Sequence, residues 1–178
     1  MRAAFNALPF PTDSQLLWLL DQEIDAEAMG NPWPIRIANV EWLDNAFDFS
    51  DEGDPTIIFR AEDHGDVTDL CGWSPRSHKL ASWQGSAFCI GDLDQAFNPA
   101  TYYADGALRI HRSPLEWLVA NREGIVIVRE ELTYANLRHC PRLAFSDAVH
   151  AKRVRRWMEP PKPQASFLVE AQAARAAA

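Results

Sequence analysis

Strand-like and helix-like segments alternate through residues 107–158, and this alternation constrains the fold more than any other feature of the sequence. Residues 107–111 (ALRIH) and 125–128 (IVIV) are rich in residue types that are typical of buried strands. Residues 113–116 (SPLE) give a helix start, because serine caps a helix, proline fits its first turn and glutamate completes a capping box. The pattern predicts a β-α-β unit.

A second round of the same pattern follows in the sequence. We expect a helix from about residue 130 to 138, a break at Pro141, a short strand at 143–145, and a helix that Ser146 caps and that runs to about Met158. Strands that are joined through helices favour parallel pairing with right-handed crossovers. The C-terminal part is therefore predicted to be a β-α-β-α-β-α unit with a partly parallel sheet.

The N-terminal half carries weaker signals. Thr12 and Gln15 have the spacing of a capping box and Gly30 can close a helix, so a helix is expected over residues 13–29. The other expected elements are strands near 35–37 and 56–60 that form a hairpin-like pair, a short helix at 66–71, and extended pieces at 80–83 and 87–90. The whole chain is accordingly predicted to have a mixed α/β (α+β) fold.

The composition supports one globular domain over residues 1–158, followed by a proline-rich segment and an alanine-rich tail at 159–178. Apolar residues make up 47% of the 178, which is enough to form a core and excludes a disordered chain. No run of about 20 apolar residues could cross a membrane, and Asn6, Pro9 and Pro11 interrupt any leader-like segment. Three widely spaced cysteines form no disulfide framework, so a cytoplasmic location is expected.

The net charge of −8 is distributed unevenly. Residues 1–131 carry a net charge of −13 and residues 132–178 a net charge of +5. An acidic bulk disfavours general binding to nucleic acids, but a basic helix can still bind an anionic partner. Four basic residues of the last predicted helix are candidates for anion binding, with a merely solvated face as the alternative: Lys152, Arg153, Arg155 and Arg156.

Polar residues follow each of the three strands predicted to be parallel. The carboxyl ends of such strands share one edge of the sheet, where ligands bind in open α/β sheets. A histidine beside carboxylates and an arginine could hold an anion or perform acid–base chemistry. The candidate catalytic residues are His111, Arg129, Glu130 and Asp147, with Arg112 and Ser146 beside them. Solvated loops and helix caps are the alternative interpretation.

Metal and cofactor sites have little support in the sequence. The acidic loop that starts at Asp48 fails the EF-hand pattern, because its twelfth position is Phe59 rather than glutamate. Phosphate-loop, dinucleotide-binding, HExxH and GxSxG motifs are absent. Four residues are of types that bind zinc but lack the closely spaced pairs of a zinc motif: His64, Cys71, His78 and Cys89. We therefore expect no metal and no cofactor.

The stretches DLCGWSP (69–75), ASWQGSAFCIG (81–91) and IHRSPLEWLVANREGIVIV (110–128) resemble segments of uncharacterised bacterial proteins. Those proteins come mainly from alphaproteobacteria and are often encoded near integrated mobile elements. The resemblance covers roughly residues 60–158 and implies a bacterial cytoplasmic protein. It implies no activity.

The sequence most favours a non-catalytic binding or interaction protein. The acidic helix predicted at 13–29 and several tryptophans offer a surface for a protein partner or for self-association. Core packing is the other role for these tryptophans and the one that we expect for most of them; they are Trp18, Trp33, Trp42, Trp73 and Trp83. Two other functions remain open: a small enzyme that uses the polar strand edge, and a nucleic-acid-associated accessory protein that uses the basic last helix.

Overall fold

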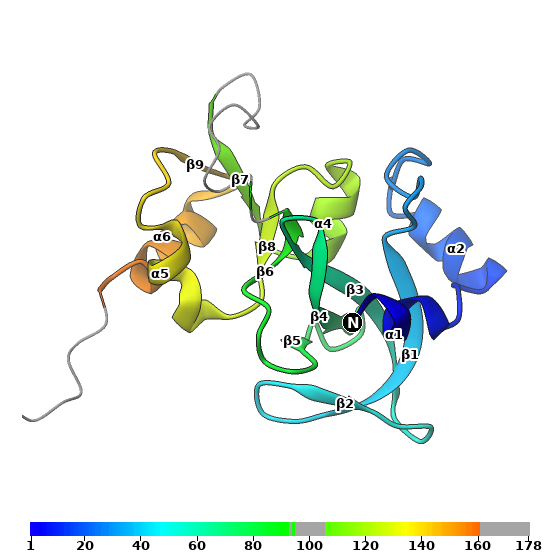
Figure 1. The fold of residues 1–178 in the computed structure, drawn as a ribbon. Helices are drawn as coiled ribbons and strands as arrows, with labels where there is room; N and C mark the ends of the chain where they lie inside the picture. The colour runs from blue at the N-terminus through cyan, green and yellow to red at the C-terminus, as the bar shows by residue number, and fades with distance from the viewer. Residues whose placement is uncertain (93, 95–105, 161–178) are drawn as a thin grey trace, which may run out of the picture.

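The computed structural model describes residues 1–92, 94 and 106–160. Its strands are β1 (Ile35–Trp42), β2 (Phe47–Phe49), β3 (Asp54–Asp63), β4 (Asp66–Trp73), β5 (Leu80–Ser82), β6 (Cys89–Asp92), β7 (Leu108–His111), β8 (Ile125–Ile127) and β9 (Leu143–Phe145). Its helices are α1 (Arg2–Ala7), α2 (Asp13–Leu20), α4 (Pro114–Val119), the 3-10 helix η2 (Glu130–Leu132), α5 (Thr133–Leu137) and α6 (Ala148–Trp157). The mixed fold and the partly parallel sheet predicted from the sequence are confirmed (Figure 1).

The N-terminal half is an antiparallel sheet in the order β2-β1-β3-β4-β5. A bridge between Ala46 and Ser82 brings the last strand back towards the first, so the sheet curls around a core of its own. Phe5 of α1 is buried in that core, together with Val40, Phe47 and Ile58.

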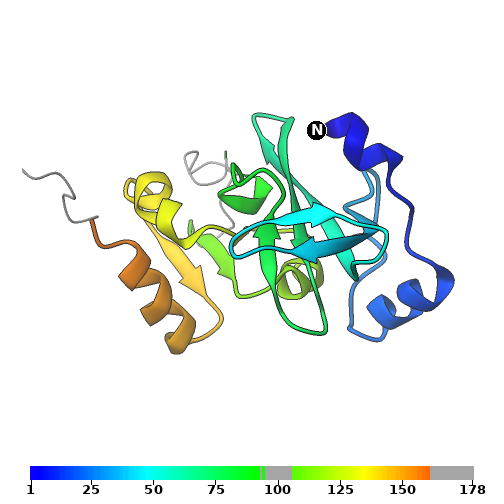
Figure 2. The ribbon, with the colours of Figure 1, turned by 90° about the horizontal axis from the view of Figure 1, so that it is seen from below.

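The C-terminal half has the parallel geometry expected of β-α-β units. β7 lies between β8 and β9 and runs parallel to both, with Ile110 opposite Ile125 on one side and Phe145 on the other. β6 joins this unit to the N-terminal sheet, because it pairs in antiparallel fashion with β8 and in parallel fashion with the end of β3. As a result, α2 and α6 lie at opposite ends of the molecule (Figures 1 and 2).

One predicted helix is a strand. Residues 66–71 belong to β4, which is paired with β3 on one edge and with β5 on the other. His64 and Gly65 connect β3 to β4 as a two-residue turn, with φ values of 49° and 79°. Two positive φ values in succession are typical of the tight turn of a β-hairpin. Sheet pairing on both edges of β4 therefore outweighs the weak local helix signal.

The predicted helix at 13–29 is also shorter than expected, since α2 ends at Leu20. The capping box is present, with the Thr12 backbone N–H donating to Gln15 Oε1 at 2.8 Å. Glu23 has a φ of 63°, which a continuing helix does not allow. The chain turns there, and Ile24 and Ala28 become buried in the core beneath.

The last helix begins one residue later than predicted, because Asp147 rather than Ser146 is its N-cap. Residues 161–178 of the predicted tail lie outside the described residues. Within the described part of the chain, no helix combines the length and the apolar character that crossing a bilayer requires.

Most of the five tryptophans are withdrawn from the surface, as we expected for most of them. Trp73 is buried, and Trp33, Trp42 and Trp83 are half-buried. Trp18 on α2 is the most exposed of the five, at 37%. Core packing is thus the main role of these side chains, with Trp18 as the exception.

Candidate functional site

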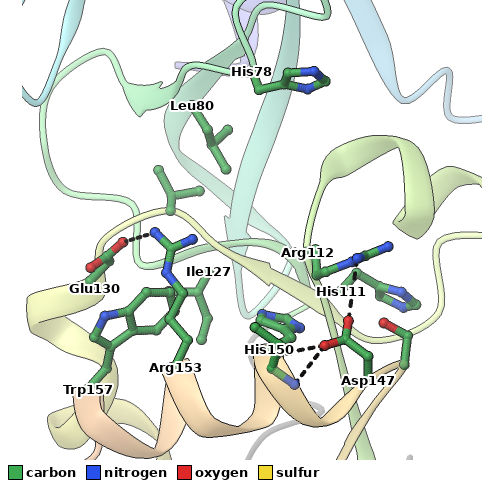
Figure 3. A pocket seen from close by; sticks show the side chains of 13 residues that line it. His78, Leu80, His111, Arg112, Ile127, Glu130, Asp147, His150, Arg153 and Trp157 are labelled. Atoms are coloured by element: carbon green, nitrogen blue, oxygen red, sulfur yellow. Dashed lines mark hydrogen bonds and ion pairs between the residues drawn. The ribbon is translucent and has the colours of Figure 1, made fainter.

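A pocket of about 760 Å³ opens at the carboxyl ends of β7, β8 and β9, against the first turns of α6 (Figure 3). This is the sheet edge at which α/β proteins place ligands. The pocket is lined by His78, Leu80, His111, Arg112, Ile127, Val128, Glu130, Ser146, Asp147, Val149, His150, Arg153 and Trp157. Its volume is within the range that holds a small organic ligand.

Helix α6 brings one group of polar side chains to the pocket. Asp147 Oδ1 caps the helix by accepting from the backbone N–H groups of Val149 and His150, both at 2.8 Å. His150, Arg153 and Trp157 follow at spacings of three and four, so they share one face of the helix. That face forms the lower wall of the pocket in Figure 3.

Arg112 stands between two carboxylates at one side of the pocket. Its Nε donates to Glu116 Oε1 at 2.6 Å and its Nη1 lies 3.4 Å from Asp147 Oδ2. Burial alone would raise the pKa of Glu116, but the hydrogen bonds and charge of Arg112 outweigh burial and lower it. The pKa of Asp147 is lowered by the backbone N–H groups that it caps, with a smaller contribution from Arg112. Both acids are therefore charged at neutral pH.

Two histidines of the pocket are held in the neutral form. The Glu123 carbonyl oxygen lies 2.7 Å from His111 Nε2, so Nε2 carries the hydrogen and Nδ1 is left as an acceptor. Burial lowers the pKa of His111, and the Glu123 carbonyl opposes this only in part. His150 is only 8% exposed, and burial also lowers its pKa despite the nearby Asp147. Its ring packs edge-on against Phe145.

Arg153 defines the opposite side of the pocket. Its Nη2 lies 2.9 Å from Glu130 Oε1, and its guanidinium lies 5.0 Å from the centre of the Trp157 ring. The side chains of Arg153 and Glu130 remain 65% and 50% exposed. A pair this exposed contributes little to stability, so Arg153 retains donors for a ligand.

Two buried polar atoms at the pocket have no hydrogen-bond partner among the described residues. They are Asp147 Oδ2, which has only the longer contact to Arg112, and His150 Nδ1. Buried polar groups in proteins are almost always hydrogen-bonded, so a buried polar atom without a protein partner indicates that a water or a ligand binds there. The two atoms lie in adjacent turns of one helix start and line the same pocket.

The structure brings together three of the four candidate catalytic residues. His111, Glu130 and Asp147 all line the pocket, and Arg112 and Ser146 line it as well. Arg129 does not, because its guanidinium is bound to the Gly85 carbonyl and lies 2.5 Å from Glu131. Of the basic residues of α6, only Arg153 lines the pocket, whereas Lys152, Arg155 and Arg156 are exposed outside it.

The four weak zinc candidates are not gathered into one site. Cys71 and Cys89 are free and buried, His78 lines the pocket, and His64 is exposed. Among the described residues, Asp63, His64 and Asp94 are the one group of three whose side chains approach one another as metal ligands do. No zinc motif predicted this group, since its members come from a hairpin turn and from the segment after β6.

Sequence reasoning missed His150, Trp157 and Val149 as pocket residues and considered His78 only as a metal ligand. The signal for the residues on α6 was present in their spacing from the Asp147 cap. The approach of His78 and Leu80 to the C-terminal unit depends on how β5 folds over the sheet, and local sequence carries no such information.

Comparison with known proteins does not assign the chain to a family. No family model, no curated protein and no solved structure matches the chain.

Proposed function

We propose that this chain is a non-catalytic binding protein that takes a small polar ligand in the pocket at the carboxyl ends of β7, β8 and β9. The observation that carries the proposal is the pair of buried atoms that lack a hydrogen bond, Asp147 Oδ2 and His150 Nδ1, in a pocket of about 760 Å³. A ligand that donates hydrogen bonds to these atoms removes the cost of leaving them unpaired.

The charges around the pocket indicate the chemical class of the ligand. Arg112 and Arg153 present guanidinium groups from opposite sides, while Asp147 and Glu130 are carboxylates. With both types of charge present, the pocket suits a molecule that has an acidic group together with N–H or O–H donors. Leu80, Ile127 and Trp157 supply an apolar surface for the rest of the molecule.

Binding is tested directly by mass and by thermal unfolding. Native mass spectrometry of the freshly purified protein is expected to show a bound small molecule that is lost on denaturation. Amino acids, dicarboxylic acids and nucleoside monophosphates are then added separately, and a member that binds raises Tm by mass action. Bare protein mass together with an unchanged Tm across all three classes would contradict the proposal.

A matched pair of variants assigns the binding to the pocket. Arg153→Met removes a guanidinium that lines the pocket and is expected to abolish the Tm increase. Arg156→Met makes the same change on the exposed side of α6 and is expected to retain it. Equal behaviour of the two variants would show that the ligand binds elsewhere.

A small enzyme is the second candidate, and the neutral state of His111 and His150 favours it. A neutral imidazole at the wall of a pocket can accept a proton from a bound substrate. The enzyme is distinguished from the binding protein by incubating it with the identified ligand and measuring the ligand's mass over time. A ligand that is recovered unchanged after prolonged incubation rejects catalysis.

We propose a cytoplasmic location for the same chain. Its three cysteines are thiols rather than disulfides, and a reducing compartment keeps cysteines in that state.

A further inference from the structure

Helix α2 carries an apolar surface on its outer side. Leu17 and Leu20 are neighbours on α2 and are 63% and 54% exposed, Trp18 on the same helix is 37% exposed, and Phe10 in the segment before the helix is 59% exposed. We define the α2 face as these four residues. A groove of about 220 Å³ runs alongside Trp18 and is walled by Ile37, Pro55 and Ile57. A clustered apolar surface with an adjoining groove is typical of a docking site rather than of scattered surface residues.

The surroundings of the α2 face are strongly acidic. Residues 3–35 contain no lysine or arginine and five acidic residues, all of them exposed: Asp13, Asp21, Glu23, Asp25 and Glu27. Arg36 lies 3.8 Å from the centre of the Phe10 ring, but its side chain is buried, so the exposed charges of this segment are all negative. Like charges repel and opposite charges attract across an interface, so the partner of this face has to be basic. It also needs an apolar group that can enter the groove beside Trp18.

Helix α6 presents a surface of the matching kind. Val149 is 80% exposed and is followed at spacings of three and seven by Lys152 and Arg156, which are also exposed. These three residues form one stripe on the helix, and we define them as the α6 face. The stripe has an apolar end and a basic remainder, which is the complement of an apolar face with an acidic rim.

We propose that the α2 face binds the α6 face of a second copy of this chain. The two faces lie at opposite ends of the molecule, so they cannot meet within one chain (Figures 1 and 2). Each copy then has an α2 face at one end and an α6 face at the other, and each face can bind a different copy. Such head-to-tail contacts build rings or open chains rather than a symmetric dimer.

The test uses the full-length protein in sedimentation velocity over a range of concentrations. The wild type is expected to form species larger than a dimer as its concentration rises. The association is expected to weaken at about 1 M salt, where the Debye length falls to about 3 Å. A wild type that remains a monomer at every concentration overturns the proposal.

Two variants each remove one face. Leu17→Glu breaks the α2 face, and Lys152→Glu with Arg156→Glu breaks the α6 face. Each is expected to raise the dissociation constant by at least about thirtyfold, as the loss of a central contact does. Val119→Glu, at an exposed apolar position on α4, is the control for the first change. Arg138→Glu with Arg155→Glu is the control for the second, since it changes the net charge equally outside the α6 face.

Mixing the two variants gives the decisive result. Each variant keeps the face that the other has lost, so an equimolar mixture is expected to form a 1:1 dimer and nothing larger. A symmetric contact between two α2 faces predicts instead that the α6 variant associates with itself, alone and in the mixture, while the Leu17→Glu variant stays monomeric in both, and this result overturns the proposal. Val149 of the α6 face also lines the pocket, but none of the substituted residues does, so a loss of association in these variants is distinguishable from a loss of ligand binding.

Discussion

Asp69 on β4 is a buried carboxylate that organises the chain around it. It is fully buried, and its oxygens accept from the backbone N–H groups of Leu70, Gln84, Ser86 and Ala87 and from the Ser86 hydroxyl. A buried charge is tolerated where hydrogen bonds replace its hydration. Through these bonds, one side chain fixes the loop that leads from β5 to β6.

Removing this carboxylate should destabilise the protein strongly. Asp69→Ala leaves several inward-pointing N–H groups without an acceptor, and we expect a loss of about 3 kcal/mol or more in the free energy of unfolding. Asp69→Asn is also expected to be destabilising, because the NH₂ group of the new side chain would face the backbone N–H groups that Asp69 accepts from. Urea denaturation provides the measurement. Asp44→Asn, at an exposed acid, should stay within about 0.5 kcal/mol of the wild type.

The three cysteines differ in reactivity for a structural reason. Burial raises the pKa of the Cys71 and Cys89 thiols, whereas Cys140 is half-buried. Since the thiolate is the reactive species, we expect one thiol of the native protein to react readily with Ellman's reagent and all three to react in denaturant. Cys140→Ser should remove the fast reaction. Rapid labelling of two or more thiols in the native state would contradict this assignment.

At the scale of the elements, the helix starts and the short strands of the C-terminal part could be predicted. The Ser113 cap and the β9 boundaries agree with the structure because their signals are local. The assignment of residues 66–71 failed because pairing with β3 and β5 on the two edges of β4 outweighs the local helix signal. The edge location of His111, Glu130 and Asp147 followed from parallel pairing, whereas the turn of Arg129 towards Gly85 depends on a contact that spans 44 residues.

The cap of α4 offers a test at this scale. Ser113 Oγ accepts from the Glu116 backbone N–H, so Ser113→Ala leaves that donor without its partner at the helix start. We expect a loss of about 1 kcal/mol in the free energy of unfolding. Ser113→Thr keeps a capping hydroxyl and should retain most of the stability. Thermal unfolding of the wild type and the two variants is the measurement. Equal destabilisation by Ser113→Ala and Ser113→Thr would show that the capping hydroxyl does not stabilise α4.

At the scale of the whole molecule, the pocket is built where the two halves of the fold approach each other. The C-terminal unit supplies the strand ends and α6, while the N-terminal half supplies Leu80 from β5 and His78 from the loop before it. His150 is buried and His111 is partly buried at this place, and burial lowers the pKa of both rings, so both are neutral at pH 7. The stability of the molecule therefore depends on pH through these two side chains.

The direction of this dependence follows from the lowered pKa values. As the pH falls through about 6.5, the imidazoles of the unfolded chain take up protons before those of the folded protein, so the unfolded state is favoured. We expect the stability of the wild type relative to His150→Phe to decrease between pH 8 and pH 5.5. Urea denaturation measures the difference in the free energy of unfolding between the two proteins. Its value at pH 8, where His150 is neutral in the folded and the unfolded state, is the reference. A difference that is constant or increases on acidification would reject a neutral, buried His150.

Strand β6 has a consequence for how the molecule comes apart. In the part of the chain that the structure describes, β6 is the single strand through which pairing passes from one half to the other, and it meets β3 at only two residue pairs. Gly91 stands at this junction with a φ of 100°, and a Cβ there would lie 2.5 Å from the Gly124 carbonyl oxygen. We expect Gly91→Ala to push β6 away from the start of β8, so that calorimetry resolves two melting transitions in the variant and one in the wild type.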